Sequence, residues 1–248
     1  MADEKAAKKE TAEKKEAAAQ GRRASDRGRY GRLSRERVLA TALEVVDRDG
    51  LSGLSMRKLG AELGVEAMAL YRYAAGKAAL LDGLVEAFCQ ELEEELAAGP
   101  READWQRELH RIALATHGVA LRHPNMVPLL ATRLLSTPLA RRPAAVLRSD
   151  ERVLALLHEA GMGERRTVRV HRAFTAWLLG YLLVELRAMD DEPGEPDPAF
   201  RLGLHRMPAR EFPRLRATAI ALDGRGGPRQ LADGLDALLG SPLLRGDG

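Results

Sequence analysis

Cysteine is almost absent from this sequence of 248 residues: Cys89 is the only one, so no intrachain disulfide can form. Long hydrophobic runs are missing as well. The longest uncharged stretch of the apolar part, residues 173–184, has 12 residues, whereas a membrane-spanning helix needs about 20. The lysine-rich N-terminus lacks the apolar segment of a secretory signal. We therefore expect a cytoplasmic protein with no membrane partner, in which Cys89 is a small buried hydrophobe.

Catalytic and metal-binding motifs are missing too. The six histidines are dispersed, and the sequence contains no H-E-x-x-H pair, no cysteine cluster and no glycine-rich phosphate loop. His110 and His117 share a helical face, but such a lone pair is more often part of a surface or a core than of a metal site. We expect no catalytic residue, no metal and no cofactor, and an enzyme is the least favoured interpretation.

What the sequence does have is an uneven distribution of charge. The net charge of +3 divides into +5 for residues 1–80 and −2 for the remainder, and every lysine lies at or before Lys77. Positive charge gathered at one end favours a polyanionic partner for that end, although charge alone equally allows a solvated basic tail. Residues 1–30 have no apolar stripe, and we expect them to form a disordered basic arm.

The rest of the chain has helical periodicity, and no alternating, strand-like run of useful length interrupts it. A first helix is expected from Ser34, a suitable N-cap, to Gly50. Beyond Gly76, proline and glycine separate further helical segments at residues 77–97, 103–121, 125–135, 139–160, 164–189, 209–223 and 229–239. The sequence therefore predicts an all-α fold.

Residues 54–81, LSMRKLGAELGVEAMALYRYAAGKAALL, contain two short helices separated by a glycine. Ser55 is placed to cap the first helix and Gly64 to end it, and Gly60 supplies the small side chain that a close helix crossing needs. On the second helix Val65 and Leu70 face inward. The residues left available to a partner are Ala67, Met68, Ala69, Tyr71 and Arg72. This pattern predicts a helix-turn-helix whose small residues allow close approach to base edges in a major groove.

The side chains that follow this second helix have the chemistry to bind DNA. The hydroxyls of Tyr71 and Tyr73 can donate to phosphate oxygens, Lys77 supplies a positive charge, and Arg72 can form two hydrogen bonds with a guanine edge. The alternative is that both tyrosines pack with locally satisfied hydroxyls while Arg72 is solvated. For the whole cluster, placed after a capped helix and a glycine turn, we favour DNA binding.

Residues 33–85, LSRERVLATALEVVDRDGLSGLSMRKLGAELGVEAMALYRYAAGKAALLDGLV, resemble the DNA-binding domain of the TetR family of transcriptional regulators. The resemblance is carried by the S-R-E-R start, the D-G after the first helix, the S-x-R-x-L-G-x-x-L-G-V core and the L-Y-x-Y-x-x-x-K-x-x-L segment. The remainder is similar to the tetracycline-repressor-like branch through its helix lengths, Trp105, Arg122-His-Pro and a late G-L-D-x-L-L.

This resemblance implies a function for individual residues. Phosphates would be held by Ser55, Arg57, Tyr71, Tyr73 and Lys77, and bases would be faced by Ala67, Met68, Ala69 and Arg72. It also implies a three-helix, helix-turn-helix DNA-binding domain at residues 31–77 and a larger helical domain at 78–248 for ligand binding and dimerisation. Tetracycline-type members bind drug-chelated magnesium through a histidine just after the fifth helix. Residues 124–135 contain no histidine, so we do not predict that ligand.

Two stripes of residues compete on the helix expected at 164–189. Phe174, Trp177 and Tyr181 form an aromatic stripe, which favours a core or a subunit interface. The second stripe mixes polar and apolar groups and suits a small-molecule pocket. We predict that the pocket holds a largely apolar effector and is lined by Val168, His171 and Thr175, with Leu109, Ile112, Ala113 and Thr116 from the helix at 103–121 as its opposite wall. An interior helix with one satisfied histidine is an equally open alternative.

Taken together, these patterns predict a homodimeric transcriptional repressor that binds a palindromic operator in double-stranded DNA and releases it when a small-molecule effector binds. The main rival is a constitutive DNA-binding regulator without an effector. An enzyme of unknown class is a distant third.

Overall fold

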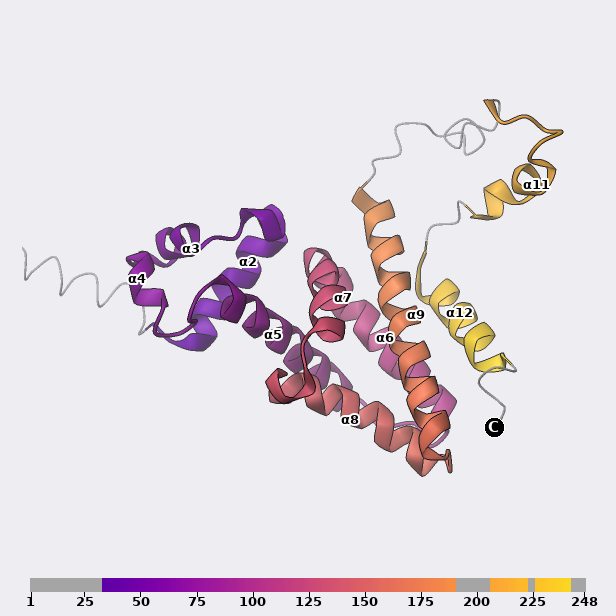
Figure 1. The fold of residues 1–248 in the computed structure, drawn as a ribbon, viewed down its shortest axis with the longest axis horizontal. Coiled ribbons are helices and arrows are strands. Elements are labelled where there is room, and N and C mark those ends of the chain that lie inside the picture. The colour runs from indigo at the N-terminus through magenta and orange to yellow at the C-terminus, as the bar shows by residue number, and fades with distance from the viewer. Residues whose placement is uncertain (1–32, 191–205, 223–225, 242–248) are drawn as a thin grey trace, which may run out of the picture. The chain divides into compact units, whose positions relative to one another are not determined.

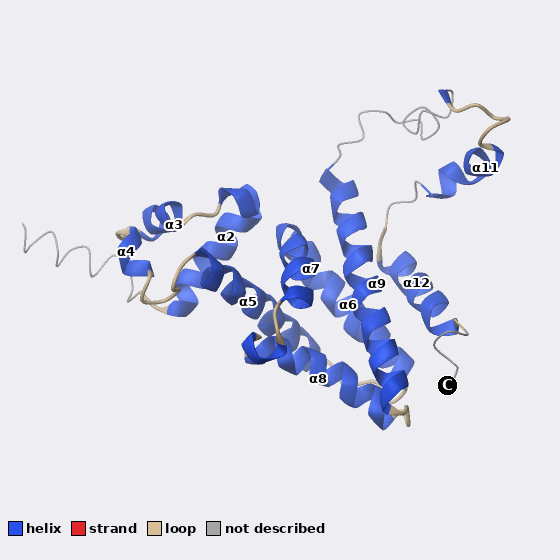
Figure 2. Cartoon of the chain, viewed as in Figure 1, coloured by secondary structure: helices blue, strands red, loops and turns tan. Residues whose placement is uncertain are grey.

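The computed structural model describes residues 33–190, 206–222 and 226–241. In these ranges the chain forms helices and turns and no strand, as Figure 2 shows, which confirms the all-α prediction. No helix of the described ranges is long and apolar enough to cross a membrane. The expected basic arm at residues 1–30 lies outside these ranges.

The helices follow one another along the chain as Figure 1 labels them. They are α2 (Arg35–Gly53), α3 (Met56–Leu63), α4 (Ala67–Leu70), α5 (Lys77–Ala97), α6 (Trp105–Arg122), α7 (Val127–Ser136), α8 (Ala144–Glu159), α9 (Glu164–Asp190), α11 (Pro213–Leu222) and α12 (Pro228–Gly240), with short 3-10 helices η1 (Pro124–Met126) and η2 (Leu139–Arg141). The pattern of internal contacts divides the chain into two compact units, with the boundary after Leu84. The helix α5 therefore begins in the first unit and ends in the second. A domain boundary at Lys77, where α5 begins, stays a prediction.

The first unit is built on α2, whose start and buried face follow from the sequence. Ser34 caps the helix by accepting a hydrogen bond from the Arg37 amide at 3.2 Å. Apolar residues at helical spacing form the buried face: Val38, Leu39, Ala42, Val45 and Val46. Gly50 breaks the helix with a left-handed φ of 71°, and one further turn follows it. The same core receives Leu59 and Leu63 of α3.

The second unit is organised around α9. The helices α6, α7, α8 and α12 each pack on it. Its buried face includes Val170, Phe174, Leu178 and Leu182, which recur about once per turn. Of the predicted aromatic stripe, Phe174 is buried, whereas Trp177 and Tyr181 are half-buried with ring centroids 5.9 Å apart.

Prolines interrupt or delay two helices that the periodicity placed too broadly. The segment expected at 139–160 is interrupted at Pro143, with η2 before it and α8 after it. The segment expected at 209–223 is helical only from Pro213. The segment expected at 125–135, by contrast, begins one residue earlier, as η1 at Pro124. Proline lacks an N–H donor and its ring clashes with the preceding turn, so it is accommodated at a helix start and not in the interior.

Candidate nucleic-acid interface and effector region

The turn between α3 and α4 has the geometry that the sequence predicted. The Ser55 hydroxyl accepts a hydrogen bond from the Lys58 amide at 3.2 Å, and Gly64 ends α3 with a left-handed φ of 67°. The Val65 amide then donates to the Gly60 carbonyl at 2.9 Å. A Cβ at Gly60 would lie 2.8 Å from the Val65 carbonyl oxygen, so glycine is required for this close crossing. The turn therefore fixes how α4 leaves α3.

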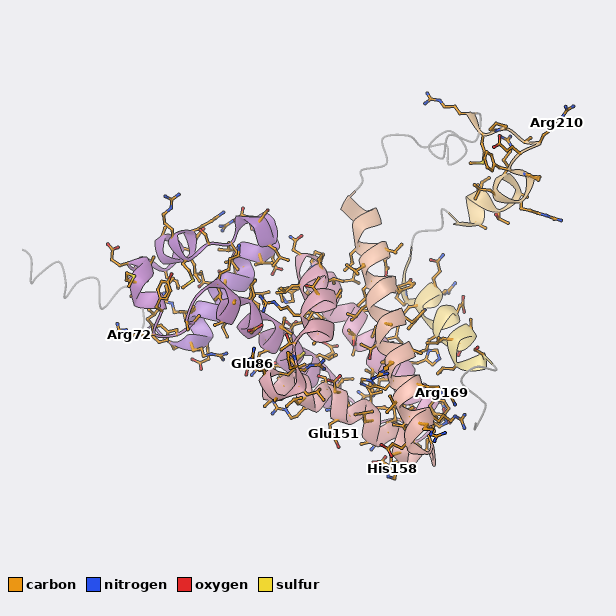
Figure 3. The ribbon with its side chains drawn as sticks, viewed as in Figure 1. Arg72, Glu86, Glu151, His158, Arg169 and Arg210 are labelled. Atoms are coloured by element: carbon orange, nitrogen blue, oxygen red, sulfur yellow. The ribbon has the colours of Figure 1, made fainter. Side chains whose placement is uncertain are left out.

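The short helix α4 separates its buried and exposed residues sharply. Leu70 is fully buried, which anchors α4 on the core of the unit, whereas Met68 is 75% exposed and Tyr71 is 47% exposed. Arg72 is exposed and projects away from the ribbon, as Figure 3 shows. The two alanines beside Met68, at positions 67 and 69, are half-buried. Amides after Leu70 continue the helical turn, since Tyr73 and Ala74 both donate to the Leu70 carbonyl.

The cationic and hydroxyl side chains predicted to bind DNA are mostly open. Arg57, Arg72 and Lys77 are exposed, and no other described residue forms an ion pair or hydrogen bond with their side chains or with the Tyr71 hydroxyl. Ser55 keeps a hydroxyl proton to donate, because its oxygen acts as the acceptor in the helix cap. These groups have hydrogen-bonding capacity for an external anion.

Tyr73 differs from the other predicted contacts. It is half-buried, and its hydroxyl donates to the Leu33 carbonyl at 2.9 Å. A phenol has one proton to donate, so donation to a phosphate would require this bond to break. A phosphate contact by Tyr73 stays a prediction. In this structure the residue ties the turn after α4 to Leu33, just before α2.

Salt bridges between α2 and α3 were missed by sequence reasoning. Between the two helices, Lys58 pairs with Asp49 at 2.8 Å and Arg48 pairs with Glu62. Arg48 also pairs with its neighbour Asp49 within α2. The hydrogen bonds from Lys58 and then Arg48 hold the pKa of Asp49 below its ordinary value. These pairs engage Lys58 and leave its neighbour Arg57 as the exposed cation at the start of α3.

The predicted pocket residues differ in burial between their two helices. On α6, Leu109, Ile112, Ala113 and Thr116 are all buried, and the Thr116 hydroxyl donates to the Ile112 carbonyl at 2.7 Å. On α9, by contrast, Val168 is 38% exposed, while His171 and Thr175 are half-buried. The α9 residues thus lie at the edge of its buried face. A pocket with both sets as opposite walls stays a prediction.

His171 has a carboxylate partner on α8 that the sequence did not indicate. Its Nε2 lies 3.3 Å from Asp150 Oδ1, and Arg142 donates to the other carboxylate oxygen of Asp150 at 2.8 Å. Burial acts to raise the pKa of Asp150, but His171 and Arg142 outweigh it and lower that pKa. The histidine therefore belongs to a polar cluster that joins α8 to α9.

Two further histidines join α6 to other helices of the second unit. His117 is 3% exposed, and its Nε2 lies 3.0 Å from Glu185 Oε2 on α9. His110 Nε2 lies 2.9 Å from Asp236 on α12. A lone acid such as Glu185 inside an apolar stretch was the available signal, because a buried carboxylate needs a partner.

A second buried carboxylate, Glu108, organises the start of α6. It is 1% exposed, and Arg111 donates to both of its oxygens at 2.8 Å. The Glu102 amide donates to it at 2.9 Å, and Arg111 also donates to the Leu96 carbonyl at 3.0 Å. Burial acts to raise the pKa of Glu108, but these donors outweigh it and lower that pKa. The pair clamps the connection between α5 and α6.

The single thiol is buried in this fold. Cys89 on α5 is 4% exposed, and burial raises the pKa of its thiol to about 12 despite a hydrogen bond with Ser149 of α8. The expectation of a small buried hydrophobe is confirmed.

Two family models match this chain. Residues 38–84 match the model described as "Bacterial regulatory proteins, tetR family", and residues 98–239 match "Tetracyclin repressor-like, C-terminal domain". The first match contains the turn and α4 described above, and the second runs from the end of α5 through most of α12.

Individual proteins resemble the chain over much of its length. It is 31% identical over 172 residues to the HTH-type transcriptional repressor DrrR1 of Streptomyces coeruleorubidus. This aligned region covers 69% of this chain and 60% of DrrR1. It is 30% identical to the class D tetracycline repressor protein of Escherichia coli, with 84% of this chain and 88% of that protein covered. The TetR family protein ActR of Streptomyces coelicolor, crystallised with (S)-DNPA, has the same fold, with a TM-score of 0.70, 23% identity and coverage of 88% and 100%.

Proposed function

The chain belongs to the TetR family of transcriptional regulators, and from this premise we propose that it is a DNA-binding repressor whose operator affinity falls when a small-molecule effector binds. The observation that carries the proposal is the exposed face of α4 and the turn after it. Met68, Tyr71 and Arg72 project from a helix that is held by the buried Leu70 and by the close crossing at Gly60. This presents a short helix to a major groove.

The proposed DNA contacts are of two chemical kinds: contacts to phosphates position the protein on the duplex, and contacts to base edges read the sequence. Arg57, Lys77, Tyr71 and Ser55 bind phosphates, which orients the protein on the duplex without regard to sequence. Arg72 reads a guanine through its fork of N–H donors, and Met68 faces the bases with the small residues Ala67 and Ala69 beside it. Tyr73 joins the phosphate contacts only where its bond to Leu33 opens.

The operator is palindromic and the repressor is a homodimer. One recognition helix per chain covers too few bases for high specificity, and two copies related by a two-fold axis double the reading surface. The outer side of α9 is suited to a second copy, since Ala176 and Gly180 are exposed and Val184 is 73% exposed. Small residues allow helices to approach closely, and covering Val184 removes apolar surface from water.

The effector binds the second unit and is largely apolar. The class D tetracycline repressor, which resembles the chain over most of its length, is named for a small molecule. Here the α6 residues supply apolar surface, and His171 supplies a polar group at the edge of α9. An effector that replaces Asp150 as the partner of His171 also disturbs Arg142, so it alters how α8 packs on α9. The helices α8 and α9 would then have two packing arrangements, one with and one without the contact between Asp150 and His171. An effector that binds one arrangement more tightly shifts the protein toward it. As a regulator of operator DNA, the protein works in the cytoplasm.

Selection of duplexes from a random pool by the purified protein tests the proposal directly. We expect a two-fold symmetric operator, bound by a dimer in sedimentation analysis, with affinity that falls steeply as salt rises. A library of small molecules is then screened for release of this operator. Failure to enrich any duplex would refute DNA binding. Tight binding by a stable monomer to an asymmetric site would refute the dimer.

The rival functions predict different outcomes in the same experiments. A constitutive regulator would bind the selected operator equally well in the presence of every compound. An enzyme would consume a compound in the absence of DNA. The exposed α4 surface favours a DNA-binding protein over an enzyme, and the screen separates the two kinds of regulator.

A further inference from the structure

Met68 has the largest exposed fraction, 75%, among the large hydrophobic side chains that the structure describes as exposed. Single exposed hydrophobic residues are common and usually need no explanation. This one, however, lies on α4 between two alanines, and Tyr71 and Arg72 follow it by three and four residues. That spacing places all three side chains on one side of the helical turn. Met68 is therefore an apolar group inside a polar, cationic surface.

The chemistry of the thioether limits what Met68 can recognise. It has no hydrogen-bond donor, and its sulfur is a weak acceptor, so it cannot pair with the amino or carbonyl groups of base edges. The C5-methyl of thymine is the one apolar group that the major groove presents. A phosphate is no better a partner, because an apolar side chain gains nothing from a charged oxygen. Thymine is the matching ligand.

We propose that Met68 reads one thymine in each operator half-site by packing its side chain against the C5-methyl group. The inference rests on the proposed function, since it requires α4 in a major groove. Ala67 and Ala69 leave room for the helix to approach, and the unbranched methionine side chain adapts to the position of the methyl. Arg57 and Lys77, both exposed, bring the polyanion to this face.

Deoxyuridine tests this contact, because it differs from thymidine only by the missing methyl and keeps its base pairing. Each thymine of the selected operator is replaced in turn, and the affinities of the parent and of Met68→Ala are measured. Burying one methyl group corresponds to about a fourfold change in affinity, or about 15-fold for both half-sites. We expect this loss for the parent at one symmetric pair of positions. Met68→Ala should bind the thymine operator more weakly and lose the discrimination there.

Two further variants make the result specific. Met68→Leu should keep most of the discrimination, because it retains an apolar side chain. Lys77→Ala should weaken binding to both duplexes by the same factor and leave the thymine-to-uracil ratio unchanged. Melting temperatures should be similar for all three variants, since both side chains are exposed.

The proposal would be overturned if, at every position, the ratio of affinities for the thymine and uracil duplexes were the same for the parent and for Met68→Ala. A selected operator whose half-sites contain no thymine would also overturn it. Both results leave DNA binding itself intact. Enrichment of no duplex at all would instead overturn the proposed function and this inference with it.

Discussion

Replacing Gly60 by alanine should force α3 and α4 apart. The added Cβ would lie 2.8 Å from the Val65 carbonyl oxygen and 3.2 Å from the Ala67 amide nitrogen. Both are backbone atoms, so no side chain can rotate away, and the segments must separate by about half an ångström to reach ordinary contact. Overpacking of this kind costs about 1–3 kcal/mol, and the better helix propensity of alanine offsets about 1 kcal/mol. We expect a net loss of up to about 2 kcal/mol in the free energy of unfolding.

Urea unfolding and operator affinity measure the two consequences of Gly60→Ala. Because Gly60 sets how α4 leaves α3, the variant should also bind the selected operator about tenfold more weakly or worse, even where it is fully folded. Gly118→Ala on α6 is the matched control, since its Cβ would meet only Arg122 Nη1, at 4.0 Å. That control should gain about 0.5–1 kcal/mol of stability. A Gly60→Ala protein with the stability and operator affinity of the parent would refute the reasoning.

Other side chains give separate tests. Arg72→Ala should relax base preference at one position per half-site, at a cost of about 1–3 kcal/mol, whereas Lys77→Ala should weaken binding to all sequences and reduce the salt slope by about 1; indistinguishable selected-site profiles would contradict this division. The lowered pKa of Glu108 stabilises the fold above pH 4.5, its ordinary pKa, and this contribution is lost as pH falls through the lower folded-state value. Glu108→Gln should therefore be less stable at neutral pH and show a flatter acid limb in unfolding measurements. His171→Ala should weaken effector-triggered release and leave effector-free operator affinity nearly unchanged; loss of DNA binding together with a lower melting temperature would assign His171 to the core.

Features that depend on a few neighbouring residues were predictable from the sequence. The caps at Ser34 and Ser55 and the left-handed Gly64 are local, because each involves groups within four residues. The bounds of α5 were predicted at Lys77 and Ala97 and are observed there. The helices expected at 139–160 and 209–223 were drawn too long, since apolar periodicity continues through Pro143 and Pro213, which the interior of a helix does not accommodate.

Contacts between distant segments could not be predicted in the same way. The His117 and Glu185 side chains are 68 residues apart in the chain, and Tyr73 and Leu33 are 40 apart. Periodicity reports which face of a helix is apolar, but it does not say which neighbour covers that face. His171 illustrates this limit, because its spacing placed it on a mixed stripe, whereas its partner Asp150 depends on how α8 packs on α9.

The single buried thiol can serve as a chemical probe of local opening around Cys89. At a pKa of about 12, only about one Cys89 side chain in 100,000 is a thiolate at neutral pH, and the thiolate is the form that reacts. When α5 separates from α8, the pKa returns toward its ordinary value of 9.0, and the reactive fraction rises on the order of a thousandfold. Because the chain has no second cysteine, the rate of alkylation reports how much of the protein has this one thiol exposed, with no engineered label.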